Sequence, residues 1–156
     1  MLVRGSANAV ARCPRNYAWF EVDAAPRIFE GEKTVPEILV VDDSKVMRDM
    51  IAACLRPDPS LAITQAASGL EAIERLSLKA YDALVLDLNM PDIGGLEVVE
   101  FVRGQDKLKT LPILIVTTRA DDGSREKVLA AGASKYLTKP FTPDVILAEL
   151  QGLLGS

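Results

Sequence analysis

Several polar side chains follow apolar runs in this sequence, and together they could handle a phosphoryl group. They are Asp42 with Asp43, Asp87, Thr117 with Thr118, and Lys139. Three carboxylates repel one another unless a cation joins them, and oxygen-rich acidic sites suit Mg²⁺. A lysine and a hydroxyl suit the phosphoryl oxygens, and an aspartate beside a metal can accept phosphate as an acyl phosphate. The set predicts a phosphoryl-accepting aspartate with a metal, a lysine and a hydroxyl around it.

Each member has an ordinary interpretation when it is taken alone. Asp42 and Asp43 could only cap the following helix and complement its dipole, and Ser44 needs no role beyond capping. Threonine is common in strands, and a single lysine is usually a surface residue. Placement at the ends of four apolar runs favours a shared site over these readings.

Histidine and cysteine narrow the chemistry. The sequence has no histidine, which excludes Ser-His-Asp and Cys-His catalysis and histidine metal sites. Cys13 and Cys54 are far apart and indicate neither a zinc motif nor a disulfide framework. Any chemistry here must therefore use carboxylates, hydroxyls and lysine.

Strand and helix patterns alternate from residue 38 onward. The predicted strands are 38–42, 61–67, 82–88, 111–118 and a short one within 132–140. Helices are predicted from Ser44 with the apolar stripe Met47, Met50, Ile51, Cys54 and Leu55, from Ser68 with Glu71 in a capping box, over 96–103, up to Ala131, and from Thr142 with Pro143 at its first position. Five such units predict an α/β fold with a parallel sheet. Ligands bind such sheets at the carboxyl ends of the strands, where all the polar groups above would lie.

Residues 1–35 differ from the rest. They show no sustained periodicity, and we expect a partly disordered extension before a domain at 36–156. A net charge of −4 and a pI of about 4.9 give no indication of nucleic-acid or membrane binding. No apolar run approaches the roughly 18 residues of a membrane span, and no secretory apolar core begins the sequence. The expected location is the cytoplasm.

The motifs together resemble a known family. LVVDDS (39–44), LVLDLNMP (84–91), PILIVTT (112–118) and ASKYLTKPF (133–141) are similar to the receiver domain of two-component response regulators, in its order and spacing. The resemblance covers residues 37 to 154. It implies a flavodoxin-like, doubly wound five-stranded parallel sheet in the order 2-1-3-4-5, with helices on both faces.

The resemblance also implies a role for each site residue. Asp87 would be the phosphoacceptor, Lys139 would bind the phosphoryl group before a cis peptide to Pro140, and Thr117 with Tyr136 would form the switch. The implied cofactor is Mg²⁺ (or Mn²⁺), with Asp42, Asp43, Asp87 and the backbone carbonyl of Asn89 as ligands. The implied partners are a sensor histidine kinase or histidine phosphotransfer protein and a downstream target protein, for a monomer or weak dimer that is not itself an enzyme.

The chain departs from the family pattern near the site. Gly94-Gly95 replaces the usual Asp-Gly, which we expect to loosen the loop after Asp87, and Thr118 replaces a frequent alanine, which would narrow access to the phosphoryl group. One alternative class is a metal-dependent phosphohydrolase of the haloacid dehalogenase kind. Those enzymes have their nucleophile on the first strand as Asp-x-Asp and their acidic pair last, whereas here the pair comes first.

Overall fold

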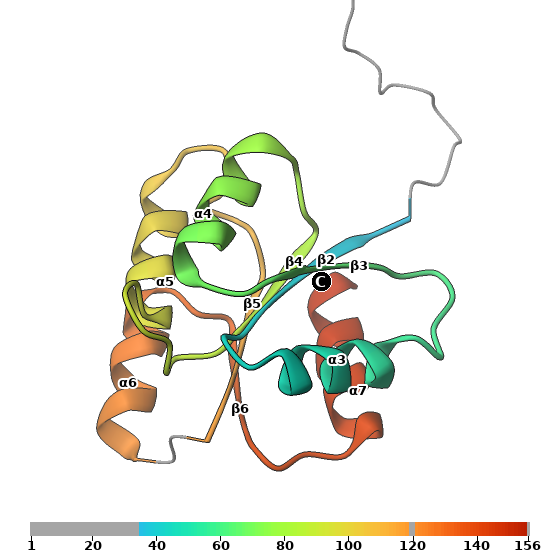
Figure 1. Cartoon of the computed structure of the whole chain (residues 1–156). Coiled ribbons are helices and arrows are strands. Elements are labelled where there is room, and N and C mark those ends of the chain that lie inside the picture. The colour runs from blue at the N-terminus through green and yellow to red at the C-terminus, as the bar shows by residue number, and fades with distance from the viewer. Residues whose placement is uncertain (1–34, 119–120, 156) are drawn as a thin grey trace, which may run out of the picture. The chain divides into compact units, whose positions relative to one another are not determined.

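The computed structural model describes residues 35–118 and 121–155, which contain five strands and five helices (Figure 1). The strands are β2 (Glu37–Val41), β3 (Ala62–Ala66), β4 (Ala83–Leu86), β5 (Ile113–Thr117) and β6 (Lys135–Thr138). The helices are α3 (Lys45–Leu55), α4 (Gly69–Leu78), α5 (Gly95–Gly104), α6 (Asp122–Ala131) and α7 (Pro143–Leu154). The extension predicted for residues 1–35 lies, apart from Val35, outside the described residues.

All five strands pair in parallel in the order β3-β2-β4-β5-β6. In chain order this is 2-1-3-4-5, which confirms the arrangement expected from the family resemblance. The chain leaves the first strand toward one edge and later crosses to the other side of it. The reversal lies between β2 and β4, where ligands bind in sheets of this kind.

Two hydrophobic layers sandwich the sheet, because consecutive side chains of a strand point to opposite faces. Leu39 and Val41 of β2 pack in the layer under α4, α5 and α6, whereas Ile38 and Val40 pack in the layer under α3 and α7. Figure 1 shows these two groups of helices on opposite sides of the sheet. Burial on both faces explains why β2, β4 and β5 are apolar without alternation.

The predicted helix starts are confirmed, with one change of detail. The Ser44 hydroxyl accepts from the Met47 N–H at 3.3 Å, and the Ser68 hydroxyl accepts from the Glu71 N–H at 3.1 Å. The Glu71 carboxylate does not reach back to Ser68. It accepts from the N–H of Ala67, one residue earlier, at 2.8 Å. The reciprocal box is therefore extended by one residue, and it still satisfies two backbone donors.

The apolar stripe predicted for the first helix is correct except at one position. Ile51, Cys54 and Leu55 are buried and Met47 is partly buried, but Met50 is 40% exposed. Met50 lies at the edge of the stripe, beyond the part that faces the sheet. None of the helices in residues 35–118 and 121–155 has the length and apolar character that crossing a membrane requires.

Candidate functional site

The register of the two central strands places Asp42 beside Asp87. Val41 is the partner of Leu86 in the β2–β4 pair, and the Asp87 N–H donates to the Val41 carbonyl at 3.0 Å. The sequence predicted strands through 42 and through 88, but β2 ends at Val41 and β4 at Leu86. Each aspartate therefore stands just past the sheet, where its backbone can turn into a loop and its side chain can enter a site.

Asp42 is almost completely buried, at 2% exposure, and both of its carboxylate oxygens have partners. Oδ2 lies 2.8 Å from the Lys139 Nζ, and Oδ1 accepts from the Ser44 N–H at 2.9 Å. The capping interpretation of this acidic pair is thus partly correct, because one oxygen binds the turn before α3. The other oxygen forms a buried ion pair with a residue 97 positions away. Asp42 therefore binds the turn before α3 and also takes part in the buried ion pair with Lys139.

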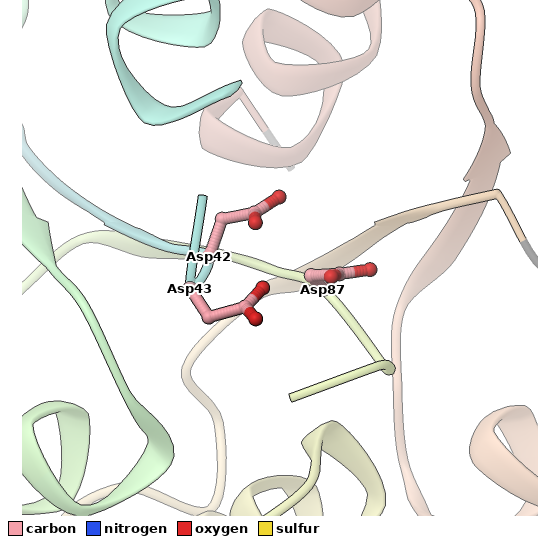
Figure 2. Close-up of side chains that lie close together, drawn as sticks. All are labelled: Asp42, Asp43 and Asp87. Atoms are coloured by element: carbon pink, nitrogen blue, oxygen red, sulfur yellow. The ribbon is translucent and has the colours of Figure 1, made fainter. Parts of the chain in front are cut away.

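Asp43 completes an acidic cluster with Asp42 and Asp87 (Figure 2). Each of the three offers a carboxylate oxygen, and these oxygens lie within 4.8 Å of one another. Asp43 is exposed, whereas the other two are buried. Hard oxygen donors at this spacing suit Mg²⁺ or Mn²⁺, which prefer carboxylates and keep several waters. The residues present therefore fit the cation that the sequence predicts.

Asp87 is buried at 6% exposure with unsatisfied hydrogen-bonding capacity. Its Oδ1 has no hydrogen-bond partner and lies 3.8 Å from the Lys139 Nζ, outside hydrogen-bond range. Burial raises the pKa of Asp87, and the Lys139 charge opposes that rise while the nearby Asp42 charge adds to it. Hydrogen bonds from the Thr117 side chain and the Asn89 backbone lower the pKa by smaller amounts. An unpartnered buried oxygen is costly, so this atom requires an explanation.

The remaining predicted residues lie at the end of β5, on β6, and in the loops after β4 and β6. Thr117 ends β5, is fully buried, and accepts the Lys139 N–H on its carbonyl at 2.8 Å. The peptide between Lys139 and Pro140 is cis, as expected from the resemblance. Tyr136 lies on β6 with its ring partly buried in the layer under α6, and the Arg125 guanidinium carbon lies 5.6 Å from the ring centroid. Asn89 is exposed, two residues after Asp87.

The loop after Asp87 has two glycines with separate tasks. At Gly95, a Cβ would lie 2.5 Å from the Asp87 carbonyl, so the first turn of α5 packs directly against the backbone of Asp87. At Gly94, the N–H donates to the Glu97 carboxylate at 2.9 Å and so begins the helix without a side-chain cap. Sequence reasoning missed this close approach, although a glycine at the first position of a helix is a signal for one.

Comparisons with known proteins agree with this geometry. The family model for the response regulator receiver domain matches residues 38–151. The chain therefore belongs to the receiver-domain family of response regulators, which act in two-component signal transduction and are regulators rather than classical enzymes. Receiver domains bind Mg²⁺ in an acidic pocket, and this chain has an acidic cluster of three aspartates.

Among its relatives are single-domain chemotaxis proteins. The chain is 37% identical over 121 residues to chemotaxis protein CheY1 of Helicobacter pylori, covering 77% of this chain and 98% of that protein. It is equally identical to a chemotaxis protein CheY homolog of Campylobacter jejuni, covering 93% of that protein. The solved structure of the response regulator CheY4 of Vibrio cholerae matches with a TM-score of 0.72 and 36% identity, over 78% of this chain and 100% of that chain.

Proposed function

We propose that this protein is a phosphorylation-dependent signalling switch in which Asp87 accepts a phosphoryl group from the phosphohistidine of a sensor kinase or a histidine phosphotransfer protein. The observation that supports this most is the state of the Asp87 Oδ1. This oxygen is buried, has no hydrogen-bond partner, and lies at the end of a central strand close to a lysine. A structural carboxylate would be paired in such a place, whereas a nucleophile needs an available oxygen.

The transfer exchanges one bond for another. An Asp87 oxygen attacks the phosphorus, the P–N bond to the donor imidazole breaks, and the imidazole nitrogen takes a proton from solvent. The product is an acyl phosphate that carries about −1.5 to −2 charges. Lys139 binds the phosphoryl oxygens, and the Thr117 hydroxyl donates to one of them. Asp42, Asp43, Asp87 and the Asn89 carbonyl would hold Mg²⁺ (or Mn²⁺), which neutralises the charge that develops on the transferred group.

Labelling by a small acyl-phosphate donor tests the assignment. With Mg²⁺, intact-mass measurement should show one added phosphoryl group per chain, and a chelator should abolish the addition. Asp87→Asn keeps the size of the side chain and removes the nucleophile, so it should show none. The matched control is Asp58→Asn, because Asp58 lies in the turn after α3 and away from the cluster. Stoichiometric labelling of the Asp87→Asn variant would show that the phosphoacceptor is another residue.

We further propose that phosphorylation changes the Thr117 and Tyr136 side chains and, through them, the affinity for a downstream target protein. Thr117 lies beside Asp87, and the backbones of β5 and β6 pair next to it, so a shift of its hydroxyl can reach β6 directly. Arg125 and Tyr136 are candidate contacts for the target, since arginine and tyrosine are frequent in binding hot spots. The Arg125 guanidinium over the ring connects α6 with the same residue.

NMR spectra with and without beryllium fluoride and Mg²⁺ test this coupling. Signals from the acidic cluster should shift, and so should those of Tyr136 and of the residues of α6 that pack on it. A full conversion from 1:99 to 99:1 would require about 5.5 kcal/mol of differential stabilisation, so a partial shift in population is the expected result. Changes confined to Asp42, Asp43 and Asp87 would contradict the coupling and leave the phosphoacceptor assignment intact.

A further inference from the structure

The backbone carbonyl of Asp42 is held by a side chain. Asp42 follows the last residue of β2 that pairs in the sheet, and the Arg48 Nη1 donates to its carbonyl oxygen at 2.7 Å. Arg48 lies on α3, in the first two turns after the acidic pair. This contact is as short as the ion pair between Asp42 and Lys139. The residue before Asp43 is therefore fixed at its side chain and at its carbonyl.

Arg48 is itself fixed by a second contact. Its Nε donates to the Gln65 Oε1 on the neighbouring strand β3 at 3.2 Å, and the Gln65 amide donates to Asp49 at 3.3 Å. Arg48 is partly buried, and its planar guanidinium therefore bridges α3, β3 and the end of β2. A fork that is held on two sides has little freedom left, so its direction toward the carbonyl is well defined.

The orientation of this carbonyl matters for Asp43. The Asp42 C=O and the Asp43 N–H belong to one planar peptide unit, so fixing the carbonyl fixes the direction in which the chain continues. Within residues 35–118 and 121–155, the Asp43 carboxylate makes no hydrogen bond or ion pair, although one of its oxygens lies within 4.8 Å of oxygens of Asp42 and Asp87. Its position in the cluster thus depends on its backbone.

We propose that Arg48 is a positioning residue for the divalent cation of the acidic cluster, acting through the Asp42–Asp43 peptide. This inference rests on the proposed function, because it requires the cluster to bind the cation. Arg48 is also a positive charge close to the site, and a charge alone would weaken cation binding. The two effects have opposite signs. Positioning predicts that removing Arg48 weakens binding, whereas repulsion predicts that removing it strengthens binding.

Residues that orient metal ligands without touching the metal typically contribute about 10- to 100-fold to affinity. Only one of the carboxylates is oriented in this way here, so we expect Arg48→Ala to raise the dissociation constant for Mg²⁺ by about 10-fold. Arg48→Lys keeps the charge but cannot bind Gln65 and the carbonyl with one planar group. Its dissociation constant should lie between those of the wild type and Arg48→Ala.

Titration calorimetry with MgCl₂ measures these constants without reference to phosphorylation. The matched control is Arg56→Ala, which removes the same side chain and charge from the C-cap of α3, where Arg56 is exposed. We expect the control to bind Mg²⁺ within twofold of the wild type. The same titrations at high salt separate the two effects further, because screening reduces a charge effect and leaves a geometric one.

Each outcome has a defined meaning. Unchanged or tighter binding by Arg48→Ala overturns the inference, as does an equal loss in Arg56→Ala. If Arg48→Ala does not fold, Arg48→Lys and Gln65→Leu provide the test instead. Gln65→Leu removes one of the two hydrogen-bond partners of the Arg48 guanidinium. Wild-type affinity for Mg²⁺ in both variants would overturn the inference. A wild-type protein that fails to bind Mg²⁺ would instead contradict the proposed metal site, and with it the proposed function.

Discussion

Asp42 and Asp87 occupy equivalent places on adjacent strands and differ in almost every contact. Both follow a fully buried run, and both are nearly inaccessible to solvent. Asp42 has a partner for each carboxylate oxygen and for its carbonyl, provided by Ser44, Lys139 and Arg48. The Asp87 Oδ1 has no hydrogen-bond partner. The Lys139 ammonium group lies 3.8 Å from this oxygen and already forms an ion pair with Asp42.

This difference fits the two tasks that the proposed function assigns to Asp42 and Asp87. A group that holds a cation and a lysine in place works best when every one of its own atoms is fixed, since a well-defined site needs rigid supports. A group that forms a bond to phosphorus needs an oxygen that nothing else occupies. The cost of leaving that oxygen unpaired is tolerated at a functional site, where perturbed carboxylates concentrate.

Replacing Asp42, whose two carboxylate oxygens both have partners, should have the largest effect on stability. Asp42→Ala leaves the buried Lys139 with only the more distant Asp87, and the cost of breaking a buried pair from one side is about 3 kcal/mol. The Ser44 N–H loses its acceptor as well. Urea unfolding at neutral pH without divalent cations should show this loss in the midpoint with little change in slope.

Asp43→Ala is the control for this measurement. Asp43 carries the same charge one residue further on, but it is exposed, and within the described residues its carboxylate makes no hydrogen bond or ion pair. Its free energy of unfolding should change by less than about 0.5 kcal/mol. Equal losses in the two variants would mean that Asp42 acts by its charge and not by the contacts described above.

Local signals were sufficient to predict much of the fold. The apolar runs 38–41, 83–86 and 113–117 were predicted as strands, and they form β2, β4 and β5, which are buried on both faces. Ser44, Ser68 and Thr142 gave the starts of three helices. The strand ends were predicted one to two residues too long, because polar residues that follow a strand directly have no local mark that separates them from it.

The contacts that distinguish Asp42 from Asp87 could not be read from the sequence. The Asp42–Lys139 pair spans 97 residues, and its partner choice depends on the register of five strands. Arg48 looked like any arginine on a helix, since nothing local ties it to a carbonyl six positions earlier. Gly69 was likewise unremarkable, although a Cβ there would lie 2.4 Å from the Ile93 carbonyl in the loop after Asp87. Motif order identified the site residues as candidates, and tertiary geometry gave their different environments.

Replacing Asp87, whose Oδ1 has no hydrogen-bond partner, should have a smaller effect on stability, and in the opposite direction. Burial raises the pKa of Asp87, so the folded state disfavours its charged form. A carboxyl group whose folded pKa is above its unfolded value contributes stability at low pH, and that contribution is lost as pH rises through the folded pKa. At neutral pH and without divalent cations, Asp87→Asn should therefore have a higher free energy of unfolding than the wild type, because asparagine carries no charge that the folded state disfavours.

The difference in free energy of unfolding between Asp87→Asn and the wild type should disappear as the pH is lowered, because protonated Asp87 is neutral like asparagine. Unfolding free energies measured at a series of pH values with a chelator present would show this convergence, and Asp43→Asn should follow the wild type throughout. Added Mg²⁺ should also reduce this difference in free energy of unfolding, because it compensates the charge on Asp87 and so stabilises the wild type. A pH-independent gap would mean that asparagine gains a new contact. A destabilised Asp87→Asn would mean that the Asp87 charge is already well paired by Lys139, and the contrast with Asp42 would then be lost.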